Sequence, residues 1–415
     1  MRYKRLISAI IIATLFVCTF GTNLSYGKTV KATEVTKHVV NGTTLSVRWK
    51  SVSDVDGYQI QYANNRFFNK AESVTVNDGE KTSKEIKKVS IKSPYVRIRA
   101  YTEDEDGNKT YSQWAHSSNC RMNKKASLTS IKKTSSKNSK KLELRKLSGQ
   151  KMENFDTMQG GVAYGNTGWY IMYDRNKSKC KIAKINLKTK KLIKVSPELN
   201  ISHGNDIAYN SNRKQLVVAH GAPNYKLVSF VDPDSLVIQK TVTLTLPKGT
   251  PGASNSNCSN FSGITAIAYN TNHKMYVARL KSQGHIVQYD ENLNAVKYVR
   301  LDKKDNYLFQ CMDSYSEYML VGQSPGNGGK ENIISVYNWD GKYMSRVSLG
   351  STYELENVYH KNGNFYAGFY RSYYKTVYVD GFTIKVTYGK KNKVKTKLKK
   401  TKLLRDNYIY KITNL

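Results

Sequence analysis

Nine side chains in the C-terminal two thirds of the chain are of types that bind sugars or catalyse their hydrolysis. They lie just before or within five similar apolar segments, and they are Gln159, His203, Asn205, Asp206, Thr265, Gln310, Asp313, Glu354 and Glu356. Amides, hydroxyls and imidazoles exchange hydrogen bonds with hydroxyl-rich ligands. Carboxylates can do more, because glycoside hydrolysis uses one as general acid and another as nucleophile or base.

The most distinctive of these segments is Ser202-His-Gly-Asn-Asp206, where Gly204 allows the backbone to approach a ligand closely. In a functional interpretation, His203, Asn205 and Asp206 bind a sugar, a phosphate or an ion. In a structural one, Asn205 and Asp206 bond to backbone amides of neighbouring segments and His203 caps a turn. The sequence leaves both open.

We predict a non-catalytic ligand-binding set, without metal or cofactor, that comprises Gln159, His203, Asn205, Asp206, Thr265, Gln310 and Glu356. The alternative is a glycosidase or lyase at the same place, with carboxylates supplied by Asp206, Asp313, Glu354 and Glu356. These acids share no catalytic motif, and the chain has no nucleophile elbow, P-loop, Rossmann glycine set or His-Glu-x-x-His. A protein-binding scaffold is a third possibility.

An internal repeat in the sequence predicts where these candidate residues lie in the fold. Its markers are five tyrosines that each end an apolar strand, at spacings of 45, 60, 46 and 44 residues: Tyr164, Tyr209, Tyr269, Tyr315 and Tyr359. The long spacing contains a Gly/Ser/Asn-rich insertion, 247–262. A second strand follows each tyrosine, then a third, then in four repeats a turn built on Asp232, Asp290, Asn338 or Asp380, then a fourth strand.

Four strands in about 45 residues are typical of β-propeller blades, so we predict a five-bladed propeller over 147–415. The first strand of each blade would line the channel, and the residues before it would open onto one mouth. The closing strand could come from 141–145 or from 408–412.

The segment His203-Gly-Asn-Asp-Ile-Ala-Tyr-Asn210, followed by a Leu-Val-Val strand, is similar to a strand in propellers of Gram-positive surface proteins and some phage receptor-binding proteins. The resemblance covers about fifteen residues. It implies binding of a wall ligand.

Short alternating strands with turns between them also fill the region 28–120, which predicts a β-sandwich. Here the chain resembles the fibronectin type III family through Trp49, Asp56–Tyr62, Val96–Ala100 and Ser112–Trp114. Pro94 stands where the family usually has its corner tyrosine. The resemblance implies a spacer module, and a flexible basic linker is predicted over 121–146, so the whole fold is expected to be all-β.

Residues 1–27 read as a secretory signal peptide, with basic residues, an apolar run and then Ser25-Tyr26-Gly27. No later segment is apolar enough to span a membrane, so we expect a secreted or non-covalently wall-associated protein. Four cysteines would remain, Cys120, Cys180, Cys258 and Cys311, with no zinc-site spacing. Inert thiols are the expectation, although the compartment permits a disulfide.

The chain has a formal net charge of +36, and loss of Arg2, Lys4 and Arg5 with the signal lowers it to +33. Such a charge favours anionic partners, and we expect a cell-wall glycan or anionic polymer rather than a specific nucleic acid. The best polyanion-binding candidates are Lys390, Lys391, Lys393, Lys395, Lys397, Lys399 and Lys400. The alternatives are a compositional bias across the chain and a merely solvated hairpin.

Overall fold

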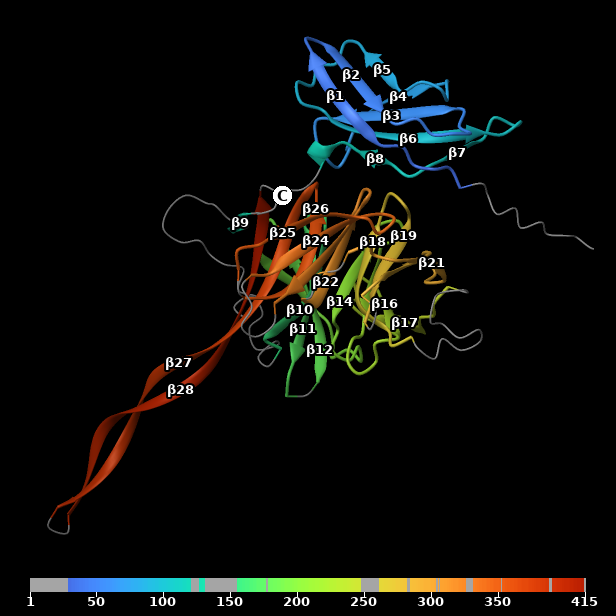
Figure 1. Cartoon of the computed structure of the whole chain (residues 1–415). Coiled ribbons are helices and arrows are strands. Elements are labelled where there is room, and N and C mark those ends of the chain that lie inside the picture. Colours follow the sequence, from blue (N-terminus) through green and yellow to red (C-terminus); the bar gives the residue numbers. More distant parts are fainter. Residues whose placement is uncertain are drawn as a thin grey trace, which may run out of the picture. The chain divides into compact units, whose positions relative to one another are not determined.

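The computed structural model describes residues 29–120, 127–130, 155–176, 178–247, 261–281, 284–303, 305, 307–325, 331–351, 353–387 and 390–413 (Figure 1). Side chains are described except at 127–130, 373, 375–387, 390–406 and 413. The predicted signal peptide, Cys258 and the candidate closing strand at 141–145 lie outside the described residues.

The described chain is all-β apart from one short 3-10 helix, η1 (Ser118–Cys120). It divides into two compact units. The first comprises residues up to Gln61, Glu72–Lys92 and Val96–His116, and the second comprises Tyr62–Ala71, Ser93–Tyr95 and the residues from Ser117 onward.

The strands of the N-terminal region form two antiparallel sheets. One has the order β1 (Val35–Asn41), β2 (Thr44–Trp49), β5 (Ser83–Ile86); the other has the order β4 (Glu72–Val76), β3 (Gly57–Ala63), β6 (Tyr95–Glu103), β7 (Lys109–Tyr111), and β8 (Ala115–His116) also pairs with β6. Every second residue of β2 is buried, as expected for a strand with one face on a core. Trp49 of β2 packs on Tyr58 of β3 with ring centroids 5.2 Å apart, which joins the two sheets.

In the second unit, the described residues form five four-stranded antiparallel sheets. The first four follow chain order: β10 (Thr157–Tyr164), β11 (Thr167–Asp174), β12 (Lys179–Asn186), β13 (Lys191–Val195); β14 (Asp206–Asn210), β15 (Gln215–Ala219), β16 (Leu227–Val231), β17 (Ile238–Thr243); β18 (Ile264–Asn270), β19 (Met275–Leu280), β20 (Ile286–Tyr289), β21 (Ala295–Val299); β22 (Leu308–Tyr315), β23 (Tyr318–Ser324), β24 (Ile333–Asn338), β25 (Tyr343–Ser348). The fifth has the order β26 (Glu354–Lys361), β27 (Asn364–Thr387), β28 (Lys390–Thr413), β9 (Ser127–Ser130).

The five sheets are arranged in a closed ring. The first strands of successive sheets contact one another, and β26 of the last sheet contacts β10 of the first. Hydrophobic clusters fill the spaces between neighbouring sheets, and the cluster that closes the ring joins Tyr170 and Ile185 of the first sheet to Tyr359 and Ile409 of the last. Burial of these apolar side chains, at roughly 25 cal/mol per Å², is the main stabilising contribution.

The turns after the third strands are fixed by short polar side chains. Asp232, Asp290 and Asn338 each accept backbone N–H groups two to four residues ahead, which confirms three of the four predicted turns. Asn186 does the same in the first sheet. The turn predicted at Asp380 is wrong, because that residue pairs with Lys397 in the middle of the β27–β28 hairpin.

The fourth strand of the fifth sheet is β9, which is neither of the two candidate closing segments. Tyr408–Ile412 lies in β28, the third strand, and β9 is the fourth, pairing with Tyr410–Thr413. Ser127–Ser130 lies inside the predicted linker, and the structure has a strand at these four residues. They are uncharged within a basic stretch, which suits a strand that completes a sheet edge.

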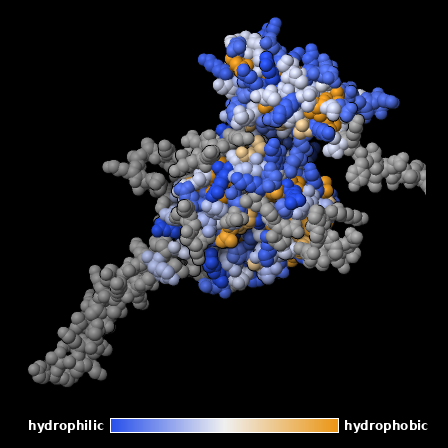
Figure 2. Space-filling model, viewed as in Figure 1, coloured by the Kyte–Doolittle hydropathy of each residue, from blue (hydrophilic) through white to orange (hydrophobic). Residues whose placement is uncertain are grey.

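Three of the cysteines behave as expected. Cys120, Cys180 and Cys311 are buried free thiols, and burial raises the pKa of Cys180 and Cys311. Among the described residues, no helix has the length and apolarity to cross a membrane. On the face shown in Figure 2, the described surface is mostly hydrophilic with apolar residues scattered in small groups.

Candidate functional site

A β-bulge recurs at one position of the inner strands. The strand register shifts at Gln159–Gly160 in β10, at Thr265 in β18, at Gln310 in β22 and at Glu356 in β26. These positions hold four of the predicted ligand-binding residues. A bulge leaves a residue unpaired and redirects its side chain, and bulges are common beside binding sites.

Asp206, another predicted residue, is buried and ties three sheets together. Its Oδ1 accepts the backbone N–H of Ile207 at 2.9 Å, and its Oδ2 accepts those of Ile267 at 3.2 Å and Met312 at 3.1 Å. Burial raises the pKa of Asp206, and the three N–H groups act in the opposite direction. The side chain therefore has the structural role that was one of its two interpretations.

Asn205 and His203, which precede Asp206 in the sequence, also contact other residues of the ring of sheets. Asn205 donates from Nδ2 to the Thr265 carbonyl at 3.4 Å and so links the second and third sheets. The His203 ring packs on Tyr173 with centroids 4.4 Å apart, and its pKa is lowered by burial and by Arg175.

Two further predicted residues at this end, Gln159 and Gln310, also donate hydrogen bonds within the protein. Gln159 is buried and donates to the Met158 carbonyl at 3.0 Å, and Gln310 donates to Glu354 Oε1 at 3.1 Å. Glu356 is buried, and its pKa is raised by burial and by Glu354.

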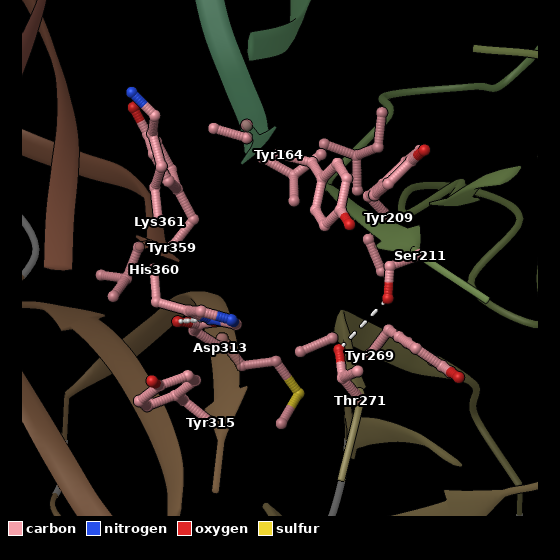
Figure 3. Close-up of a pocket in the computed structure, with 18 of the residues that line it drawn as sticks. Tyr164, Tyr209, Ser211, Tyr269, Thr271, Asp313, Tyr315, Tyr359, His360 and Lys361 are labelled. Carbon is pink, nitrogen blue, oxygen red and sulfur yellow. Dashed lines mark hydrogen bonds and ion pairs between the residues drawn. The ribbon is translucent and has the colours of Figure 1, made fainter. Parts of the chain in front are cut away.

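A cavity of about 290 Å³ lies at the other end of the same inner strands. All five repeat tyrosines line it: Tyr164, Tyr209, Tyr269, Tyr315 and Tyr359. Figure 3 shows them arranged around the opening, together with Ser211, Thr271, Asp313, His360 and Lys361. The sequence predicted these tyrosines as strand ends and the candidate ligand site at the opposite end of the strands. The polar residues that follow the tyrosines are the sequence feature that could have indicated this cavity.

The tyrosines differ in how firmly they are held. The Tyr359 hydroxyl bonds to that of Tyr170 at 2.7 Å, and the Tyr269 hydroxyl donates to Glu291 at 2.6 Å. Tyr164 is 56% exposed. Its ring lies 5.0 Å from that of Tyr209, which itself stacks on Trp169.

The Tyr315 hydroxyl is held from outside the ring. It donates to Asn69 Oδ1 at 2.9 Å. Asn69 belongs to the segment Tyr62–Ala71 of the same unit and also lines the cavity.

A histidine–carboxylate pair supplies the ionisable groups of this cavity. His360 Nδ1 lies 3.0 and 2.9 Å from the two oxygens of Asp313, which is buried. The carboxylate holds Nδ1 and leaves Nε2 available for a hydrogen bond with a ligand. Beside them, burial lowers the pKa of Lys361.

Among the described residues that line the cavity, Asp313 is the only carboxylate. The other three candidate catalytic acids, Asp206, Glu354 and Glu356, do not line it. Within the described part of the chain, no three His, Cys, Asp or Glu side chains form a group that could hold a metal ion. The cavity therefore offers aromatic rings, hydroxyls and one oriented imidazole.

No family model matches this chain, and no curated protein matches it either. Solved structures do match. Kuenenia stuttgartiensis hydrazine synthase is 11% identical with a TM-score of 0.33, covering 52% of this chain and 57% of that one. The chain thus spans little more than half of that protein's length.

Two further matches have similar scores. A protein of unknown function from Bacteroides caccae is 10% identical, with a TM-score of 0.36 and coverage of 73% and 98% of the two chains. The WD40 β-propeller domain of Doa1 is 12% identical, with a TM-score of 0.30 and coverage of 52% and 62%.

Proposed function

We propose that this chain is an exported, non-catalytic binding protein in which a five-bladed β-propeller binds a cell-wall glycan and a fibronectin type III-like module acts as a spacer. The closed ring of four-stranded sheets supports the propeller. The two facing sheets of the N-terminal region support the module.

The observation that carries the proposal is the exposed Tyr164 ring on Tyr209 at the tyrosine-lined cavity. A pyranose ring has an apolar face that packs on an aromatic plane, and its hydroxyls need donors and acceptors at the edge. Ser211, Thr271 and His360 supply these. At about 290 Å³ the cavity is at the small end of ligand sites, which suits one or two sugar residues of a longer chain.

A glycosidase is the second candidate, and the charges of the cavity weigh against it. Hydrolysis needs two carboxyl groups across the scissile bond, at about 5 to 10 Å. Asp313 is the one carboxylate among the described lining residues, and its two oxygens face His360. Binding without turnover is the function that this arrangement supports better.

The test is calorimetric titration of the mature chain with soluble fragments of purified wall polysaccharide, with reducing-end release followed in parallel. We expect binding without release, and at least a tenfold loss of affinity in Tyr164→Ala. Tyr374→Ala is the matched control, because Tyr374 is 74% exposed and does not line the cavity. Release of sugar that disappears in Asp313→Asn or Glu356→Gln would establish the enzyme instead, and equal losses in the two tyrosine variants would remove the cavity from the proposal.

A further inference from the structure

The last two strands continue far beyond the sheet to which they belong. β27 pairs with β26 only as far as Tyr370, and β28 pairs with β9 only from Tyr410. Between these limits and the hairpin end, β27 and β28 pair with each other as a ribbon that leaves the ring (Figure 1). Residues 371–387 alone span about 55 Å at roughly 3.3 Å per residue.

Lysines occupy every second position along one strand of this ribbon. They are Lys391, Lys393, Lys395, Lys397 and Lys399. Alternate positions of a strand lie on one face, so the five positions share a face, with successive Cα atoms about 6.6 Å apart. We call this the lysine face.

The partner strand adds little negative charge to the lysine face. The residues opposite the five lysines are Val386, Ile384, Phe382, Asp380 and Tyr378, of which one is acidic. Residues directly opposite in an antiparallel pair lie on the same face. On the reverse face of β28, Lys390, Lys400 and Lys402 are separated by Asn392, Val394, Thr396 and Leu398.

A regular row of like charges destabilises the isolated ribbon by self-repulsion, and a ligand with a matching row of negative charges relieves that repulsion. A linear phosphodiester chain carries such a row. When a short polyol separates the phosphates, the charges repeat at a distance comparable to that between alternate strand residues. Each additional ion pair along the row would increase the affinity for such a polymer.

We propose that the lysine face of the β27–β28 ribbon binds a linear polyol-phosphate polymer. Residues 372–404 contain many lysines and no arginine. Arginine is the preferred residue for stacking and bidentate recognition of nucleic acids, whereas lysine acts as a point charge. The row thus suits a flexible polyanion without bases. This site is separate from the tyrosine-lined cavity and does not depend on the function proposed there.

Two triple variants of the full mature chain test the proposal. Lys393→Gln/Lys395→Gln/Lys397→Gln changes the lysine face, and Lys390→Gln/Lys400→Gln/Lys402→Gln removes the same charge from the other positions of β28. The probe is poly(glycerol phosphate) of defined length, titrated over a range of salt concentrations. Thermal unfolding of each variant checks that the ring is intact.

We expect the lysine-face variant to lose at least thirtyfold in affinity and the control variant no more than threefold. The slope of log K against log salt should fall by about 2 to 3 in the first, since each ion pair accounts for about 0.7 to 0.9. Asp380→Asn should bind more tightly than the natural chain, because Asp380 lies opposite Lys397.

Equal losses of affinity in the two triple variants would mean that only the net charge of the ribbon matters, and this result would overturn the proposal. Tighter binding of single-stranded DNA or of anionic phospholipid vesicles than of poly(glycerol phosphate) would overturn the ligand class. Binding of the wall-polysaccharide fragments at the cavity should be the same in both variants, so a failure here is distinguishable from a failure of the proposed glycan site.

Discussion

The Asp206 carboxylate accepts the backbone N–H of Met312 at 3.1 Å, although Met312 lies two sheets further round the ring. The same oxygen also accepts the N–H of Ile267 in the sheet between. Inner strands of neighbouring sheets do not pair with each other in the ladder, so this side chain supplies hydrogen bonds that the sheets cannot. One buried acid thus links three consecutive sheets at the centre of the ring.

Asp206→Ala should lower the free energy of unfolding by about 3 to 5 kcal/mol, because three buried N–H groups lose their acceptor. Urea denaturation followed by tyrosine and tryptophan fluorescence measures the change. Glu354→Gln is the control, since Glu354 is exposed and should shift stability by less than about 0.5 kcal/mol. Similar values for the two variants would contradict the linking role of Asp206.

Gly160 of the first inner strand lies close to the backbone of the second inner strand at Asp206. A Cβ at this position would lie 2.7 Å from the Cα of Asp206, which is backbone and cannot move aside easily. Gly160→Ala should therefore destabilise the chain by about 1 to 3 kcal/mol. Gly165→Asn is the control, because Gly165 has a φ of +55° with open space around it and asparagine tolerates that conformation. Thermal unfolding of both variants should separate them by several degrees.

The repeat and its strand order were predictable because they depend on local patterns. The strand-ending tyrosines and the turns at Asp232, Asp290 and Asn338 follow from alternation and turn chemistry within about ten residues. The strand at Ser127–Ser130 was not predictable in this way, because its pairing with β28 joins segments almost 300 residues apart. The same applies to the long ribbon, where Asp380-Gly381 has the composition of a turn but is held in the ladder on both sides.

The candidate site was predictable in composition but not in position. For Asp206 and Asn205 the sequence left a ligand-binding and a structural role open, and in the structure both side chains bond to neighbouring sheets. Sequence periodicity defines which strands line a channel, but it does not reveal which end leaves a cavity. That depends on how closely the inner strands approach, as at Gly160, and on which side chains bridge them.

His220 should make stability depend on pH. It is buried with Nε2 2.7 Å from Ser229 Oγ, and burial lowers its pKa to about 4 from 6.5. The folded state therefore favours the neutral ring, so this stabilisation is complete above about pH 6.5 and is lost as the pH falls toward 4. The loss amounts to about 3 kcal/mol at 1.36 kcal/mol per unit.

Urea midpoints measured between pH 7 and pH 4 test this dependence. His220→Gln should flatten the profile in that window, since glutamine does not titrate. A variant with the same steep profile as the natural chain would assign the pH dependence to another group.

His360 should contribute to glycan affinity through the atom that Asp313 leaves free. With Nδ1 held by the carboxylate at 2.9 Å, Nε2 is oriented to form a hydrogen bond with a ligand hydroxyl. His360→Gln should therefore weaken binding of the wall-polysaccharide fragments by about tenfold, the value of one good hydrogen bond. His273→Gln is the matched control, because His273 also pairs with a carboxylate, Glu317 at 3.1 Å, but does not line the cavity. Calorimetric titration of the two variants measures their affinities. An equal loss of affinity in both would mean that histidine–carboxylate pairs act only on the stability of this ring.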